Sequence, residues 1–188
     1  MNALFNCIDQ YYKISDTSKT ALNKALIKEE LVKNTILVTE GTICNQLFFL
    51  EKGCVRGYYN LDGKEVSYWF SFENSFLTSF YSFISRKAGI ENIELLEDSI
   101  LWSIRYEALQ ELYDQHPDIE RMVRIVYERY YILLEERLIA SQFKTASERY
   151  EQLLEVSPHM LQRISLGHIA SYLGISQETL SRIRAKVS

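Results

Sequence analysis

The sequence predicts an α+β fold, in which an N-terminal antiparallel β-roll of jelly-roll type with flanking helices precedes a long helix and a small helical domain. Three observations lead to this prediction. Short β-rich segments with glycine at their corners occupy residues 35–104, a continuous helical pattern runs to about residue 143, and residues 166–184 have the pattern helix, turn, helix. A chain of 188 residues, 47% of them hydrophobic, can bury a core in one or two small domains.

The first predicted domain, residues 1–116, combines an early helix with the β-roll. Asp16 or Thr17 is a candidate N-cap for that helix. Its apolar positions are Leu22, Leu26 and Ile27. Runs of strand character follow, at residues 35–41, 47–53, 54–59, 65–70, 91–96 and 100–104. Because Asn60-Leu-Asp-Gly63 is a hairpin pattern between two of these runs, we expect antiparallel pairing.

A long helix is predicted for residues 117–143. Pro117 suits its first turn, and Asp118 suits its positive end. One apolar stripe repeats at spacings of four and three, as in coiled coils, and is assigned to a dimer interface. It consists of Ile119, Val123, Val126, Tyr130 and Leu133. A second apolar face consists of Tyr127, Tyr131, Leu134 and Leu138. Two apolar faces indicate two partners, the roll and a second copy of the chain, whereas the alternative is a helix buried within one chain.

The third predicted domain, residues 144–188, contains a helix-turn-helix. Gly174 supplies the permissive backbone of the turn, and Ser176 is a good N-cap for the second helix. The inward positions are Ile169, Ala170, Leu173, Ile175, Leu180 and Ile183. The outward positions, predicted to contact double-stranded DNA, are Ser176, Gln177, Glu178, Thr179, Ser181, Arg182, Arg184 and Lys186. The alternative is an ordinary helical hairpin with a solvated polar face. No β-wing is evident after the second helix.

Composition argues against several classes of protein. No run approaches the roughly 20 apolar residues of a membrane span, and the first residues lack a signal-peptide pattern, so we expect a cytoplasmic protein without membrane contact. The cysteines form no CxxC pair, which argues against a structural metal site. No catalytic triad, P-loop or dinucleotide motif occurs, so we expect neither enzyme activity nor a cofactor. Although the formal net charge is −4, the last helix carries the cations that a DNA-binding surface needs.

The order of roll, long helix and helix-turn-helix resembles the Crp/Fnr superfamily of bacterial transcription regulators over nearly the whole chain. The most specific segments are Glu51-Lys-Gly-Cys-Val-Arg56 and Gly174-Ile-Ser-Gln-Glu-Thr-Leu-Ser-Arg-Ile183. The resemblance implies a cyclic-nucleotide-binding-like domain, a homodimer, and base contacts in which Arg182 meets guanine and Glu178 meets cytosine. Two such helices, about 34 Å apart, would read a near-palindrome. RNA polymerase is a further candidate partner.

The effector site departs from that family's pattern. Relatives that bind cyclic nucleotides carry a Gly-Glu pair and an Arg-Ser or Arg-Thr pair around a short helix. Here the first pair falls on Thr78-Ser79 and the second near Gly89-Ile90, beside Glu91. A phosphate would therefore meet a carboxylate and no guanidinium, so cyclic AMP is not the expected effector. The candidate pocket residues are Thr78, Ser79, Phe80, Tyr81, Arg86 and Lys87. The alternative interpretation of this aromatic and serine-rich segment is a plain packed core.

Two functions remain from the sequence. The first is a dimeric DNA-binding regulator that reads a near-palindromic site with the helix 176–186 and is modulated by an unidentified effector at the roll. The second is a small-molecule or cyclic-nucleotide sensor that acts through protein partners and retains a vestigial DNA-binding unit. The substitution Arg182→Ala separates them, because only the first function depends on base contacts.

Overall fold

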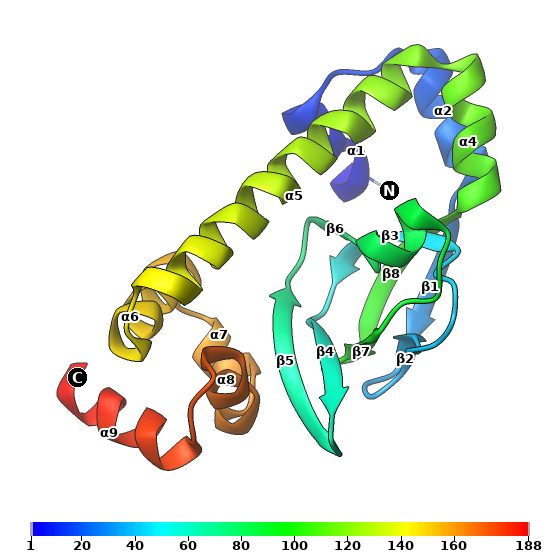
Figure 1. The fold of residues 1–188 in the computed structure, drawn as a ribbon. Helices are drawn as coiled ribbons and strands as arrows, with labels where there is room; N and C mark the ends of the chain where they lie inside the picture. Colours follow the sequence, from blue (N-terminus) through cyan, green and yellow to red (C-terminus); the bar gives the residue numbers. More distant parts are fainter. Residues whose placement is uncertain (1, 188) are drawn as a thin grey trace.

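The computed structural model describes residues 2–187 and consists of a β-roll with attached helices, a long helix and a helical head (Figure 1). The helices are α1 (Asn2–Tyr11), α2 (Asp16–Ala25), α3 (Phe80–Ser85), α4 (Tyr106–Gln115), α5 (Pro117–Phe143), α6 (Ala146–Val156), α7 (Met160–Arg163), α8 (Leu166–Leu173) and α9 (Gln177–Val187). The strands are β1 (Ile27–Leu31), β2 (Ile36–Val38), β3 (Gln46–Lys52), β4 (Val55–Leu61), β5 (Lys64–Ser71), β6 (Ser75–Leu77), β7 (Glu91–Leu95) and β8 (Ser99–Arg105). The predicted α+β class is confirmed.

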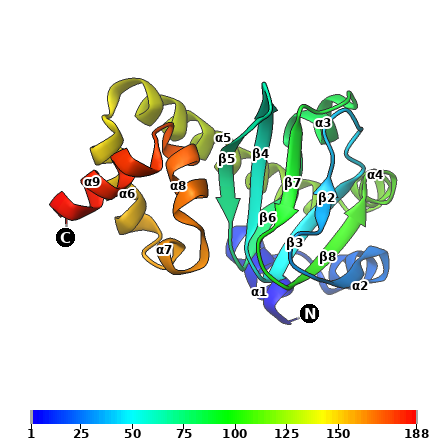
Figure 2. The ribbon, with the colours of Figure 1, turned by 90° about the horizontal axis from the view of Figure 1, so that it is seen from below.

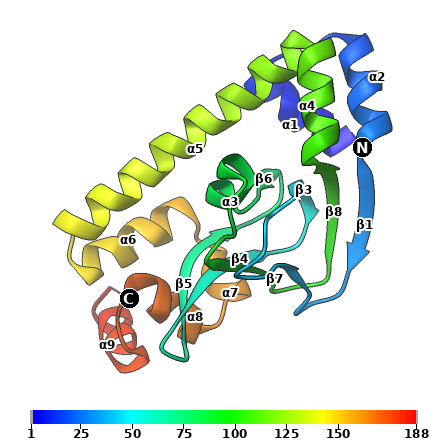
Figure 3. The ribbon, with the colours of Figure 1, turned by 45° about the vertical axis from the view of Figure 1, so that its right-hand side comes forward.

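Two antiparallel sheets form the roll (Figure 3). Their strand orders are β1-β8-β3-β6 and β2-β7-β4-β5. The hairpin β4–β5 turns at Asp62 and Gly63, whose φ values of 51° and 77° are both positive. Positive φ at both central residues matches the twist of the flanking strands, which is why Asp-Gly pairs are common there. The hairpin expected at residues 60–63 is therefore confirmed.

The early helix ends sooner than its apolar pattern predicts. Helix α2 stops at Ala25, and Ile27, expected on the helix, begins β1. Strand β1 pairs with β8 from Ile27 opposite Ser103 to Leu31 opposite Ser99. The Ser103 hydroxyl also donates to the Glu29 carboxylate at 2.9 Å. Pairing with a strand this distant in the sequence outweighs the local helical pattern.

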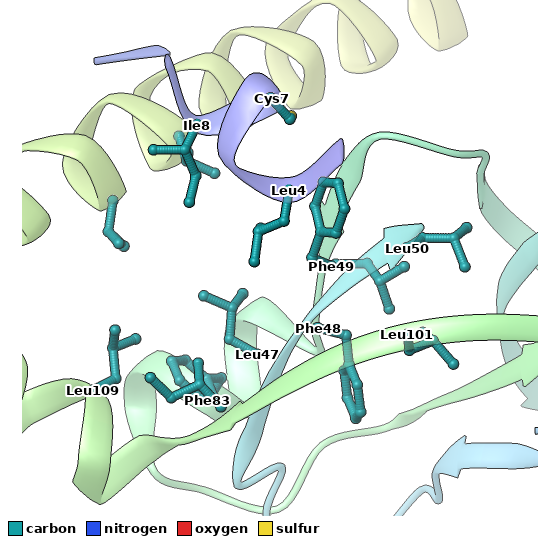
Figure 4. Close-up of a cluster of buried hydrophobic side chains, with 14 of the residues drawn as sticks. Leu4, Cys7, Ile8, Leu47, Phe48, Phe49, Leu50, Phe83, Leu101 and Leu109 are labelled. Carbon is teal, nitrogen blue, oxygen red and sulfur yellow. The ribbon is translucent and has the colours of Figure 1, made fainter. Parts of the chain in front are cut away.

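The main hydrophobic core lies between the roll, α1 and the first half of α5. Figure 4 shows Leu4 of α1 beside Phe49 of β3, and both side chains are almost completely buried. Polar contacts secure the edge of this core: the Ser18 hydroxyl donates to Asp118 Oδ1 at 2.6 Å, and the Ser15 amide donates to Asp118 Oδ2 at 2.7 Å. These bonds join the start of α2 to the start of α5 and so fix the direction in which α5 leaves the roll.

Helix α5 uses its first apolar stripe within the chain, not between chains. Ile119, Val123 and Val126 are 0%, 4% and 7% exposed because they pack on the roll. Tyr130 stacks on the phenyl ring that opens α3, with ring centroids 3.7 Å apart. The assignment of this stripe to a dimer interface is therefore wrong for these residues. Of the stripe, Leu133 remains exposed.

Gly57 of β4 gives Trp69 of β5 the space for its indole ring. A Cβ at Gly57 would lie 2.2 Å from Trp69 Nε1 and 2.3 Å from Cε2. The indole cannot shift freely, because Trp69 is buried and its Nε1 donates to Glu91 at 3.1 Å. We expect Gly57→Ala to lower the free energy of unfolding by about 1–3 kcal/mol, measured by urea denaturation. The control is Gly63→Asn, since asparagine tolerates positive φ and a Cβ there meets nothing within 4 Å. Equal stability of the two variants would contradict this packing.

The helical head packs beside β5 (Figure 2). A capping box begins α6: the Thr145 hydroxyl accepts from the Glu148 amide, and the Glu148 carboxylate accepts from the Thr145 amide. This cap lets the chain turn back directly after α5. A second buried cluster then joins side chains of the head to Cys54, Phe70 and Leu96 of the roll. The head and the roll are thus in apolar contact within one chain.

Candidate functional site

Helices α8 and α9 form the predicted helix-turn-helix. Ser165 caps α8 by accepting from the His168 amide at 3.2 Å. Gly174 ends that helix with φ 68°, in the left-handed region that favours glycine. The Ile175 amide then donates to the Ala170 carbonyl at 3.0 Å, and Ser176 caps α9. The turn, its glycine and its N-cap occur where the sequence places them.

One face of α9 is polar and exposed. Leu180 is completely buried and sets the inward side of the helix. The side chains that remain exposed are Ser176, Gln177, Glu178, Ser181, Arg182 and Lys186, whereas Thr179 and Arg184 are half-buried. Six of the eight residues predicted to contact DNA therefore lie on the open surface. Hydrogen bonding from the Ser176 hydroxyl lowers the pKa of Glu178, so its carboxylate is ionised at neutral pH.

Arg163 of α7 joins the head to the roll. Its guanidinium donates to both Glu73 oxygens at 2.8 Å and to the Glu97 oxygens at 3.0 and 2.6 Å. Hydrogen bonds from Arg163 lower the pKa of Glu73 from 4.5 to about 2. Ser171 of α8 adds a second connection, because its hydroxyl accepts from the Ser67 amide of β5 at 2.9 Å. Sequence reasoning missed both connections, since their partners are far apart in the chain.

Buried protein groups occupy the positions at which the sequence resemblance places a phosphate cassette. Ser79, which precedes α3, is fully buried. Glu91 is 7% exposed, and its Oε2 accepts from the Trp69 indole. Burial raises the pKa of Glu91. A phosphate at this position would meet the buried carboxyl group of Glu91.

The six predicted pocket residues lie in different environments. Thr78 and Phe80 line a cavity against α5. Tyr81 and Lys87 are exposed, and Ser79 is buried beside the cassette position. Arg86 turns away from the roll interior: its Nη1 donates to the Cys44 carbonyl at 2.9 Å, and its guanidinium carbon lies 3.9 Å from the Tyr106 ring centroid. The structure therefore brings only two of these residues together at one cavity.

The cavity beside Thr78 and Phe80 has a volume of about 150 Å³ and lies between β5, β6 and α5. Two arginines from α5, Arg129 and Arg137, contribute to its lining. Sequence reasoning missed both. Arg129 precedes Tyr130 and Arg137 follows Leu133, two residues of the apolar stripe that faces the roll. This position beside the stripe is the only feature of the sequence that could have indicated that the two arginines lie near the roll.

Residues 2–187 contain neither a metal-ion cluster nor a membrane-spanning helix. No group of three or more His, Cys, Asp and Glu side chains in this part of the chain is placed to hold a metal ion. Nor does any helix within it combine the length and apolar character needed to cross a membrane.

Comparisons with known proteins show what this chain is similar to. Residues 28–116 match the model of the cyclic nucleotide-binding domain. FixK2 from Bradyrhizobium japonicum shares the fold with a TM-score of 0.75 and 19% identity, over 86% of this chain and 84% of that one. The c-di-GMP-responsive global regulator CLP from Xanthomonas campestris gives a TM-score of 0.73 at 17% identity, over 92% of this chain and 91% of that one. A structure from Eubacterium rectale, described as a Crp/Fnr-family transcriptional regulator, gives 0.73 at 20% identity, over 95% of this chain and 85% of that one.

No curated protein matches the chain by sequence. The solved structures nevertheless share the fold over 86% to 95% of this chain. Residues 28–116 are thus similar to the cyclic nucleotide-binding domain, and the chain as a whole shares its fold with solved structures of Crp/Fnr-type regulators.

Proposed function

We propose that this chain is a dimeric transcription regulator of Crp/Fnr type that reads a near-palindromic DNA site with α9. The observation that carries the proposal is the exposed polar face of α9, on a helix-turn-helix with intact turn geometry. Glu178 and Arg182 are four residues apart and therefore lie on the same side of the helix. Their side chains suit cytosine and guanine edges in the major groove, and Lys186 one turn further suits a phosphate.

A dimer would supply the second reading helix. The second half of α5 extends past the roll (Figure 1) and carries large apolar side chains that are at least half exposed. Those that share one side of the helix are Tyr131, Ile132, Leu138, Ile139 and Phe143. Tyr131 and Leu138 are seven residues apart, the repeat distance of a helix pair. We propose that this exposed face, rather than the stripe buried on the roll, pairs with a second copy of the chain.

The dimer is expected to dissociate in the double variant Tyr131→Glu, Leu138→Glu. Burying unpaired carboxylates between two helices costs several kcal/mol, so the dissociation constant should rise roughly a thousandfold. Sedimentation velocity over a range of protein concentrations measures this. The control is Glu111→Gln, which changes an exposed charge on α4, away from the second half of α5 (Figure 1), and should leave the dimer intact. Dimers that persist in the double variant would locate the interface elsewhere.

The proposal is tested by selecting bound sequences from a randomised DNA pool at near-physiological salt. The wild-type protein is expected to enrich a near-palindrome whose half-sites are one helical turn of DNA apart, about 10 base pairs, or a multiple of it. The double variant at Tyr131 and Leu138 should enrich single half-sites or none. A pool that stays random with the wild-type protein would contradict the proposed function.

A further inference from the structure

The cavity between β5, β6 and α5 lies on a different side of α5 from the proposed dimer face. Its inner wall is apolar: Trp69, Leu77 and Phe80 are each at most 9% exposed. Tyr130 of α5 completes this wall by stacking on Phe80. Since successive residues of a helix point about 100° apart, Tyr130 faces the cavity while the adjacent Tyr131 faces solvent.

The charged side chains of the cavity lining are all positive. Arg129 and Arg137 both line it, and no aspartate or glutamate does. Within the part of the chain that the structure describes, neither guanidinium has a carboxylate oxygen within 4 Å. Arg129 instead donates to the Gln10 carbonyl at 3.4 Å, and its guanidinium carbon lies 4.3 Å from the ring centroid of Tyr11. Two guanidinium groups that have no carboxylate partner and lie beside an apolar wall attract a carboxylate or a similar anion.

The size of the cavity limits the ligand. A volume of about 150 Å³ is that of an engineered protein cavity that binds benzene. A purine nucleotide carries a fused double ring, a ribose and a phosphate, so it is much larger than this space. The cassette position nearby offers no alternative phosphate site, because the buried Glu91 occupies it.

We infer that this cavity binds a small organic anion with a single aromatic ring, with the ring against Trp69 and Phe80 and the anionic group between Arg129 and Arg137. A regulatory role for this ligand rests on the proposed function, because the ligand can regulate DNA binding only if the chain is a transcription regulator. A ligand at this position bridges the roll to the helix that carries the proposed dimer face and leads to the head. Binding would therefore favour one position of α5 relative to the roll, to the extent that the anion contacts both.

Benzoate is the test probe, with benzamide as its neutral counterpart of the same shape and cyclic AMP as the nucleotide. The chain has two tryptophans, so Trp102→Phe leaves Trp69, in the cavity wall, as the single fluorescent reporter. Titrations are made at constant ionic strength. We expect a saturable change with benzoate, with a dissociation constant on the order of 1 mM for so small a ligand. Benzamide and cyclic AMP should bind at least about tenfold more weakly.

Variants in the same background assign the anion contact. Arg129→Gln and Arg137→Gln are each expected to weaken benzoate binding by about tenfold or more, since each removes a charged hydrogen-bond donor. The matched control is Arg124→Gln, an exposed arginine on the same helix that pairs with Glu128, and it should bind benzoate as the parent does. Equal affinity for benzamide, unchanged affinity in both cavity variants, or no saturation with benzoate would each overturn the inference.

DNA selection reports separately on the proposed function. Benzoate binding without recovery of a DNA site would leave the ligand class standing and remove the regulatory interpretation. Recovery of a near-palindrome without benzoate binding would overturn the ligand class alone.

Discussion

Replacing Arg163 by glutamine is expected to loosen the head from the roll and to lower the free energy of unfolding by about 2 kcal/mol. The guanidinium donates to two carboxylates at once, and all three side chains are at most one-third exposed. Its removal leaves Glu73 and Glu97 facing each other without a counter-charge, so the loss exceeds that of a surface ion pair. Hydrogen exchange of residues 157–165, together with urea denaturation, measures the two effects.

The same contact predicts how stability depends on pH. The pKa of Glu73 is lowered in the folded protein, to about 2 from an ordinary 4.5. The contribution of Glu73 to the free energy of unfolding is therefore complete above pH 4.5, and it is lost as the pH falls from 4.5 towards 2. This part of the acid sensitivity should be missing in Arg163→Gln and retained in the control Arg124→Gln, whose ion pair is exposed. The opposite result is that the two variants show the same hydrogen-exchange protection and the same dependence of unfolding free energy on pH. That result would show that the ion pairs of Arg163 with Glu73 and Glu97 do not hold the head on the roll.

Replacing Arg182 by alanine is expected to remove most of the specific DNA affinity. A bidentate arginine–guanine contact discriminates against the wrong base by about 1–3 kcal/mol, and a dimer makes this contact twice. The affinity for the selected site should therefore fall by a factor of about 30 or more, while the affinity for unrelated DNA changes little. Fluorescence anisotropy on the selected duplex and on a scrambled duplex measures both quantities.

Lys186→Ala is the matched control for Arg182. It lies one turn further along the same exposed face and is expected to contact a phosphate. Its loss should weaken binding to both duplexes alike and reduce the salt dependence by about one unit of slope per contact. If Arg182→Ala behaved in the same way as Lys186→Ala, then Arg182 would be a phosphate contact and the base assignment would be wrong.

The parts of the fold that depend on local chemistry could be predicted from the sequence. Asp62 and Gly63 form the expected turn because few other residue pairs accept positive φ at both positions. Gly174 ends α8 for the same reason. Once Leu180 is known to face inward, the exposed polar face of α9 follows from the helical repeat. The candidate DNA-binding surface was therefore accessible to sequence reasoning.

The parts that depend on distant partners could not be predicted. Both apolar faces of α5 have helical spacing, and only the position of the roll decides that Val123 is buried while Tyr131 is exposed. Strand β1 exists because β8 pairs with it. Arg163 meets Glu73, 90 residues earlier in the chain, and no local pattern marks either as a partner. Arg129 and Arg137 likewise line one cavity only because α5 lies beside β5 and β6, which no local pattern predicts.

A protein–DNA mutant cycle at one base pair tests most directly whether α9 reads sequence through Arg182. Wild-type and Arg182→Ala proteins are titrated against the selected site and against the same site with its guanine–cytosine pair changed to adenine–thymine in both half-sites. We predict that the base change costs the wild-type protein about 1–3 kcal/mol per half-site and costs Arg182→Ala almost nothing further. Equal losses for both proteins at every guanine of the site would show that Arg182 reads no base and would contradict the account.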